Sequence, residues 1–229
     1  MKRKTSDQLP VLRLFQDGRR DSSTNMAMDE ALVIKTLHPV LRFYGWERPT
    51  VSLGYFCSWE DSLRRHGESF GYVRRWTGGG TVEHSELETT YSLALPAACP
   101  WGRWRAPALY KRVHTCLAVA LRDCGIVTDS FGSTSSEASG ACFEQPVAED
   151  LLLSGRKVAG AAIRHCSSGV LLQGSIQGIS VADTFPAAFA EAIAEPTGIE
   201  HWNPENSLNT RVAALVDSRY GRVEWTRRR

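Results

Sequence analysis

The stretch Arg74-Arg75-Trp76-Thr77-Gly78-Gly79-Gly80-Thr81 is the most informative part of this 229-residue sequence. It follows a run that is expected to form a strand. Three glycines after a strand leave backbone N–H groups uncovered, so that an anion can approach them closely. Because side chains alternate along a strand, Arg74 and Arg75 should face opposite sides, and only one should reach a ligand held by the turn. An ordinary hairpin turn also accounts for three glycines.

The segments on both sides of this turn are predicted to be short strands with helices between them. Strands are expected at 11–15, 40–46, 50–56, 70–76, 89–95, 148–153, 157–164 and 170–177, and helices at 22–37, 58–67, 106–124, 183–194 and 207–219. Glu47-Arg48-Pro49 suits a hairpin between the second and third strands. This irregular order predicts an α+β fold, a single domain over 1–229 with a mixed, mainly antiparallel sheet packed by helices.

Local signals mark the ends of two of these helices. Ser23 or Thr24 can cap the helix at 22–37. Ser58-Trp59-Glu60-Asp61 is a candidate capping box for the short helix that ends near Gly67. The run at 130–140 is rich in small polar residues and is predicted to be a loop.

The overall charge and composition exclude several classes of protein. The chain has 27 Lys and Arg against 25 Asp and Glu, a formal charge of +2, so binding of nucleic acid through bulk charge is not expected. Hydrophobic residues at 42% and charged residues at 23% are typical of a folded globular chain.

The cysteines and the N-terminal residues indicate the cellular compartment in which the protein is expected. The six cysteines form no C-x-x-C pair and no cluster at zinc spacing, which favours a reduced protein without a metal site. No apolar h-region precedes Pro10, and no window reaches the roughly 20 apolar residues of a membrane span. We therefore expect a cytoplasmic protein that does not enter the membrane.

Several blocks of the sequence, in order, resemble the lipoate and octanoate branch of the biotin/lipoate protein ligase superfamily. The similar blocks are 25–32, 41–46, 51–56, 73–84, 155–162 and 173–176. The resemblance implies the fold of the catalytic domain of these enzymes. It also implies that Arg74, Arg75, Gly78, Gly79, Gly80, His84, Gly160 and Ala161 bind substrate.

Lys157 is the central residue in that family pattern. The matching lysine binds the activated acyl group and assists attack by the acceptor amine. From strand alternation, Lys157 should share a face with Ala159 and Ala161, while Gly160 should lie on the other face. Periodicity alone would predict an ordinary exposed lysine at the start of a strand. Asp150 resembles an acidic position of the ligases, or simply begins a strand.

A catalytic role for Cys142 would distinguish a cysteine-dependent octanoyltransferase from an ATP-dependent ligase. The stretch from Gly140 to Pro146, followed by a strand and Gly155-Arg156-Lys157, resembles the nucleophile segment of octanoyltransferases that form a thioester on cysteine. A free cysteine is more often a small buried apolar residue. Catalysis requires a thiolate, and Lys157 is the candidate cation that would stabilise it.

The sequence departs from the family at two places. Cysteine-dependent members often carry an arginine within the glycine turn, whereas Gly78-Gly79-Gly80 is closer to the ATP-dependent ligases. Related chains often have a histidine before Gly174, where this chain has Gln173. In favour of a transferase, the chain ends soon after its last predicted helix, so a separate C-terminal accessory domain is not expected.

Three functions follow from the resemblance. The first is transfer of an octanoyl or lipoyl group to lipoyl domains of 2-oxoacid dehydrogenases or of the glycine cleavage H protein, from an acyl carrier protein through a Cys142 thioester and without a cofactor. The second is an ATP-dependent lipoate-protein ligase that uses ATP and Mg²⁺. The third is an acyl-binding module without catalysis. No nucleic acid or membrane partner is expected.

Overall fold

The computed structural model describes residues 8–85, 88–132 and 147–229, so Cys142 lies outside the described residues. The strands are β1 Leu12–Arg20, β2 Val40–Trp46, β3 Thr50–Leu53, β4 Gly71–Arg74, β5 Thr81–His84, β6 Thr89–Pro96, β7 Asp129–Ser130, β8 Leu151–Leu153, β9 Arg156–Cys166, β10 Gly169–Ile176 and β11 Ile199–His201. The α-helices are α1 Ser22–Lys35, α2 Trp59–His66, α3 Ala106–Asp123, α4 Phe185–Ile193, α5 Asn206–Leu215 and α6 Val223–Arg227.

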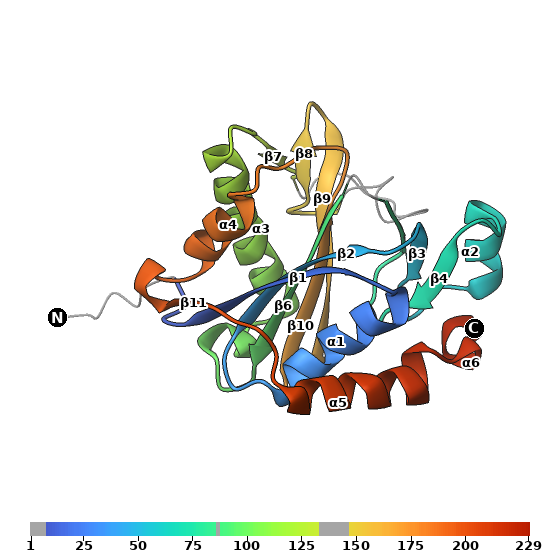
Figure 1. The fold of residues 1–229 in the computed structure, drawn as a ribbon. Helices are drawn as coiled ribbons and strands as arrows, with labels where there is room; N and C mark the ends of the chain where they lie inside the picture. The colour runs from blue at the N-terminus through green and yellow to red at the C-terminus, as the bar shows by residue number, and fades with distance from the viewer. Residues whose placement is uncertain (1–7, 86–87, 133–146) are drawn as a thin grey trace.

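The described strands form two sheets, which confirms an α+β fold with mixed, mainly antiparallel pairing. The larger sheet has the order β11-β1-β2-β6-β10-β9-β8-β7, and the smaller has the order β4-β3-β5 (Figure 1). In the larger sheet β1 is parallel to β11 and β2, and the pairs from β2 to β7 are antiparallel. In the smaller sheet β3 is parallel to β4 and antiparallel to β5.

The predicted hairpin at 47–49 is wrong. Both edges of β2 are taken, one by β1 and the other by β6, so β3 leaves that sheet and pairs with β4 and β5 instead. The residues between two strands determine only how tightly the chain can turn between them. Their partners depend on which edges the rest of the chain leaves open.

Helices cover both faces of the larger sheet, and a hydrophobic core lies on each side. Leu41 and Phe43 of β2 face the core under α3 and α4, whereas Val40 and Tyr44 face the core under α1 and α5. Figure 1 shows these two helix pairs on opposite sides of the sheet. Because both faces are covered, nearly every side chain of β2 is buried, which explains its mainly apolar and aromatic sequence. Its one charged residue, Arg42, is also buried and pairs with Asp17 and Asp29.

The helix ends partly follow the sequence. Ser58 caps α2 by accepting a hydrogen bond from the Asp61 N–H at 3.2 Å, as predicted. The cap of α1 is Asp21, not Ser23 or Thr24, because its carboxylate accepts hydrogen bonds from both of their N–H groups. In the described ranges, no helix combines the length and apolar character needed to cross a lipid bilayer.

Candidate functional site

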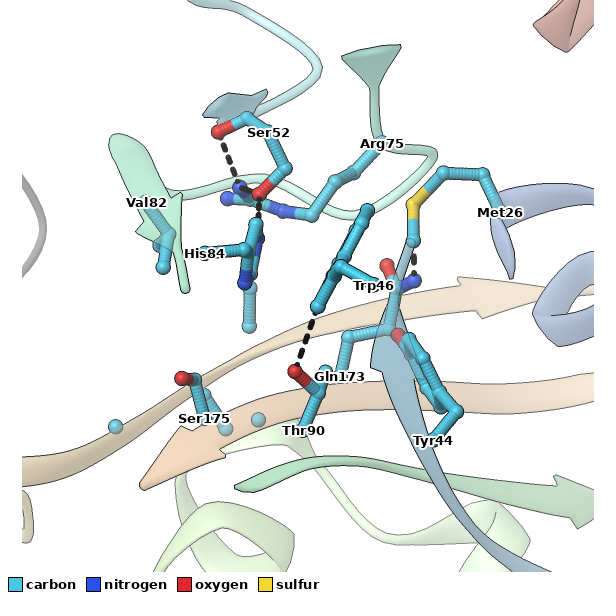
Figure 2. A pocket seen from close by; sticks show the side chains of 14 residues that line it. Met26, Tyr44, Trp46, Ser52, Arg75, Val82, His84, Thr90, Gln173 and Ser175 are labelled. Carbon is cyan, nitrogen blue, oxygen red and sulfur yellow. Dashed lines mark hydrogen bonds between the residues drawn. The ribbon is translucent and has the colours of Figure 1, made fainter. Parts of the chain in front are cut away.

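A pocket lies between the two sheets and brings together several of the predicted site residues (Figure 2). Its cavity volume is about 30 Å³, room for about two water molecules. The lining consists of Met26, Tyr44, Trp46, Ser52, Arg75, Val82, His84, Thr90, Gly160, Ala161, Ala162, Gln173, Gly174 and Ser175. Four of the predicted substrate-binding residues, Arg75, His84, Gly160 and Ala161, are therefore placed around one space.

Arg75 connects this pocket to the glycine turn. One terminal nitrogen of its guanidinium donates to the backbone oxygen of Ser52 at 2.8 Å, and the other donates to the carbonyl oxygens of Gly78 and Gly80, both at 2.9 Å. Each peptide unit is planar and trans, so the N–H groups that share those peptide units point away from Arg75. The predicted anion-binding role of the turn stays a prediction.

Gly54 and Gly79 show why this turn requires glycine. A side-chain Cβ on Gly54 would lie 1.9 Å from the carbonyl oxygen of Gly79, closer than any real contact. Gly79 itself has a φ of +82°, a conformation that glycine adopts without strain. The glycine turn therefore packs backbone to backbone against the end of β3.

Arg74 faces the opposite side, as strand alternation predicts, and the structure does not support a substrate contact for it. Its guanidinium is fully buried and donates to the carbonyl oxygens of Thr226 at 2.9 Å, Gly54 at 3.0 Å and Cys57 at 2.8 Å. Arg74 thus joins α6 to the loop after β3.

Lys157 is a buried ion-pair partner and not an exposed residue. Its side chain is 3% exposed, and the ammonium nitrogen lies 2.7 Å from Asp150 Oδ2. Asp150, which is fully buried, also accepts hydrogen bonds from the Tyr110 hydroxyl and from the Val147 N–H. Burial first, and then the neighbouring Asp150 charge, raise the pKa of Tyr110, so Tyr110 remains a hydrogen-bond donor to Asp150.

The predicted face of Lys157 is wrong. A Cβ on Gly160 would lie 2.7 Å from Cε and 2.8 Å from Nζ of Lys157, so the lysine side chain lies over Gly160. The cause is a break in the ladder between β8 and β9, where Leu151 pairs with Ala159 but Leu152 pairs with Lys157. Such a bulge interrupts the alternation of side chains, and it directs the ammonium group toward the strand segment that lines the pocket.

His84 is held in a chain of hydrogen bonds at the pocket wall. Its Nε2 lies 2.6 Å from Ser52 Oγ, its Nδ1 lies 2.6 Å from Glu88 Oε1, and the Trp46 ring stacks on it at 4.0 Å. Burial alone would raise the pKa of Glu88, but the His84 imidazole and hydrogen bonds from Thr90 and Gln177 lower it overall. Glu88 is therefore an ionised acceptor behind the wall.

Gln173 occupies the position where related chains often carry a histidine. Its Oε1 accepts a hydrogen bond from Thr77 Oγ1 at 2.7 Å, and its Nε2 donates to Asp29 Oδ2 at 2.7 Å. Asp29 is fully buried and also pairs with Arg42 at 2.7 Å. Gln173 thereby links the start of the glycine turn to helix α1.

Sequence reasoning missed Ser52, Glu88, Asp29 and Tyr110. Only Asp29 carried a usable signal, since an acid three residues after Met26 and four before Val33 lies on the apolar face of α1. Glu88 lies in a short connection, and nothing in the local sequence separates it from an exposed acid. The predicted nucleophile Cys142 lies outside the described residues.

Comparison with known proteins places these features in context. The model of the lipoyl protein ligase A/B catalytic domain matches residues 21–219. The chain is 36% identical over 177 residues to octanoyltransferase LipM of Moorella thermoacetica and 32% identical over 181 residues to octanoyltransferase LipM of Bacillus subtilis. Each alignment covers 72% of this chain and 64% of the relative, so the match spans slightly less than two thirds of these proteins.

Solved structures share the fold at low identity. Lipoate-protein ligase A bound with ATP superposes with a TM-score of 0.73 at 17% identity, covering 96% of this chain and 99% of that one. An archaeal bipartite lipoate protein ligase from Thermoplasma acidophilum superposes with a TM-score of 0.71 at 17% identity, covering 96% of both chains. At this identity the likeness concerns the fold alone.

Proposed function

Because the chain belongs to the lipoyl protein ligase A/B catalytic domain family, we propose that it is an acyltransferase that attaches an octanoyl or lipoyl group to a lysine of lipoyl domains. The observation that carries the proposal is the position of Lys157. It is a buried cation, paired with Asp150 and packed over Gly160, which lines the pocket. The names of the curated relatives, octanoyltransferases, support the choice of reaction.

The proposed reaction proceeds in two thioester-level steps. Cys142 gives up its proton, its thiolate attacks the donor thioester carbonyl, a new C–S bond forms, the C–S bond to the donor breaks, and the departing thiolate takes up the proton that Cys142 gave up. The acceptor lysine amine then attacks the Cys142 thioester, the C–N bond forms, the C–S bond breaks, and the proton lost by the amine passes to the departing Cys142 thiolate. The Lys157 ammonium, held by Asp150, stabilises the negative charge on the carbonyl oxygen in both steps.

The proposed substrate contacts follow from the pocket. Gly160 and Ala161 line the pocket, so the acyl chain is proposed to lie along this part of β9, with His84 and Arg75 on the opposite wall. The N–H groups of Gly78, Gly79 and Gly80 are the proposed site for the polar end of the donor. Val147, the first described residue after the segment that contains Cys142, donates its N–H to Asp150 at 2.7 Å, so the described chain resumes beside the Lys157–Asp150 pair.

We propose an acyl carrier protein as donor, a lipoyl domain of a 2-oxoacid dehydrogenase or the glycine cleavage H protein as acceptor, and no cofactor. The test incubates the protein with octanoyl carrier protein and a lipoyl domain, without ATP, and follows both proteins by intact mass. Octanoylation of the lipoyl domain is expected, with an octanoyl-enzyme intermediate. The Cys142→Ala variant should show neither product, whereas Cys57→Ala, which changes a free cysteine beside the glycine turn, should act like the wild type.

The unbroken Gly78-Gly79-Gly80 turn favours a second candidate, an ATP-dependent lipoate-protein ligase with ATP and Mg²⁺ as cofactors. It predicts modification of the lipoyl domain by free lipoate only when ATP is present, with release of pyrophosphate. Full activity of Cys142→Ala under those conditions would replace the transferase proposal with the ligase.

A further inference from the structure

The polar side chains that line the pocket direct their hydrogen bonds into the protein. Figure 2 shows several hydrogen bonds between the lining residues, such as the one from Trp46 to Thr90. The Trp46 N–H donates to Thr90 Oγ1 at 2.9 Å, and Arg75 donates to Ser52 Oγ at 2.7 Å and to carbonyl oxygens of the glycine turn. Two buried carboxylates receive most of the remaining donors.

Glu88 is the first of these carboxylates. It does not line the pocket, and its side chain is 3% exposed. It accepts hydrogen bonds from His84 Nδ1 at 2.6 Å, Thr90 Oγ1 at 2.5 Å and Ser175 Oγ at 2.9 Å. An ionised carboxylate only accepts, so each of these three lining residues turns its donor toward Glu88.

The donor directions around Ser52 follow from the same rule. The Arg75 guanidinium can only donate, so Ser52 Oγ accepts from it. In the neutral tautomer that carries its proton on Nδ1, His84 donates to Glu88 and accepts the Ser52 hydroxyl hydrogen on Nε2, at 2.6 Å. In that tautomer the chain from Arg75 to Glu88 runs in one direction and leaves no donor of Ser52 or His84 for the lumen.

Asp29 acts on the other side of the pocket. It is fully buried and accepts hydrogen bonds from the Tyr44 hydroxyl at 2.9 Å and from Gln173 Nε2 at 2.7 Å. Many of the lining residues thus carry polar groups, but the surface that they present to a ligand consists mainly of hydrocarbon and aromatic atoms.

We propose that Glu88 is a specificity-determining residue: by accepting the donors of His84, Thr90 and Ser175, it restricts the pocket to acyl chains that carry no hydrogen-bond acceptor along the chain. This inference rests on the proposed function, because it takes the pocket as the acyl site. A ketone oxygen on the chain would lose its hydrogen bonds to water and gain none from the wall. The expected penalty is roughly tenfold to a hundredfold in affinity.

The experiment measures binding of octanoate, and of a set of octanoates that carry one ketone at different mid-chain carbons, by isothermal titration calorimetry on the full chain. The wild type should bind octanoate about tenfold or more tightly than the ketone analogues. In Glu88→Gln the amide group presents its own donors to Ser175 and Thr90, so their hydroxyls are released toward the lumen. The ratio of the affinity for octanoate to the affinity for the ketone analogue should then fall about threefold or more for at least one ketone position.

Glu83→Gln is the matched control. Glu83 lies on the neighbouring strand β5 and accepts from His66 Nδ1 at 2.6 Å, outside the pocket lining, so its loss should leave the ratio unchanged. Circular dichroism checks the fold of each variant. An unchanged ratio in folded Glu88→Gln, or equal binding of octanoate and ketones by the wild type, would overturn the inference.

Ser175→Ala provides a second test that does not depend on the folding of Glu88→Gln. Because the Ser175 hydroxyl already points to Glu88, its removal should leave the ratio unchanged. A larger ratio would mean that this hydroxyl donates to the ligand, which contradicts the proposal. Failure of the wild type to bind octanoate would reject the acyl pocket of the proposed function as well, whereas binding without discrimination rejects this inference alone.

Discussion

Lys157 depends on a small set of buried partners at the scale of single residues. Its ammonium pairs with Asp150, and Asp150 is itself held by the Tyr110 hydroxyl and the Val147 N–H. The Tyr110 oxygen in turn accepts a hydrogen bond from the N–H of Ala161, at 3.0 Å. The lysine is therefore placed by residues from α3, β9 and the segment before β8, and its position is sensitive to each of them.

We expect Asp150→Asn to reduce both stability and acyl transfer. Removing one partner of a buried ion pair leaves the other charge uncompensated, which typically costs about 3–5 kcal/mol in the free energy of unfolding. The transfer rate should fall about tenfold or more, because the ammonium loses the group that orients it. Urea unfolding and the intact-mass transfer assay measure the two effects.

Glu149→Gln provides the comparison for this change. Glu149 pairs with Lys111 at 2.9 Å on the surface, where the lysine side chain is 66% exposed. Such pairs contribute below about 1 kcal/mol, so neither measurement should change much. Equal effects of the two substitutions would contradict the role given to Asp150.

At the scale of elements, the glycine turn and the end of β3 form one unit. Gly54 N–H donates to the Gly80 carbonyl oxygen at 3.1 Å, and Tyr55 N–H donates to the Thr77 carbonyl oxygen at 2.8 Å. These bonds bring the two backbones together at a distance that only glycine permits at position 54. The shape of the turn is thus set by a neighbouring element as much as by its own three glycines.

The Gly54→Ala substitution should displace the glycine turn. Its Cβ would lie 1.9 Å from the Gly79 carbonyl oxygen, and overpacking of this kind costs about 1–3 kcal/mol. We expect a lower thermal midpoint and a higher KM for the octanoyl donor. Gly78→Ala is the control, since its Cβ would meet no atom within 4 Å, and it should keep the stability of the wild type. A Gly54→Ala protein as stable and active as Gly78→Ala would contradict this account.

The molecule as a whole should lose stability in acid. Burial lowers the pKa of His114 to about 4, so the folded state holds this histidine neutral while the unfolded chain binds a proton. The pKa of Glu88 is also lowered, since its hydrogen-bond partners outweigh the effect of burial. Both groups therefore add stability at neutral pH. The contribution of His114 is lost as the pH falls from about 6.5 toward 4, and that of Glu88 is lost below its ordinary value of 4.5.

His114→Leu should remove much of this acid sensitivity. We expect the wild type to lose about 2–3 kcal/mol of unfolding free energy through His114 between pH 7 and pH 4.5, a loss absent from the variant. Urea unfolding at the two pH values measures it. His38→Leu changes an exposed histidine and should leave the acid sensitivity as in the wild type. The same loss in His114→Leu as in the wild type would exclude His114 as its source.

The sequence alone was sufficient for much of the fold and for part of the site. Periodicity and capping residues placed most helices and strands, and the short block around Lys157 together with the glycine turn identified residues that the structure brings to the pocket or beside it. The helices and strands are local features, because burial of one face of an element leaves a repeat in its own residues. The Lys157 block and the glycine turn were identified by their resemblance to the family.

The tertiary structure decided which strands pair, which way Lys157 points and where the polar groups of the pocket direct their donors. The face of Lys157 depends on a bulge between β8 and β9, and the roles of Glu88 and Asp29 depend on partners from four other segments. Edge occupancy, ladder register and the hydrogen bonds of buried acids are properties of elements that meet in space. These properties therefore cannot be predicted from any single segment of the chain.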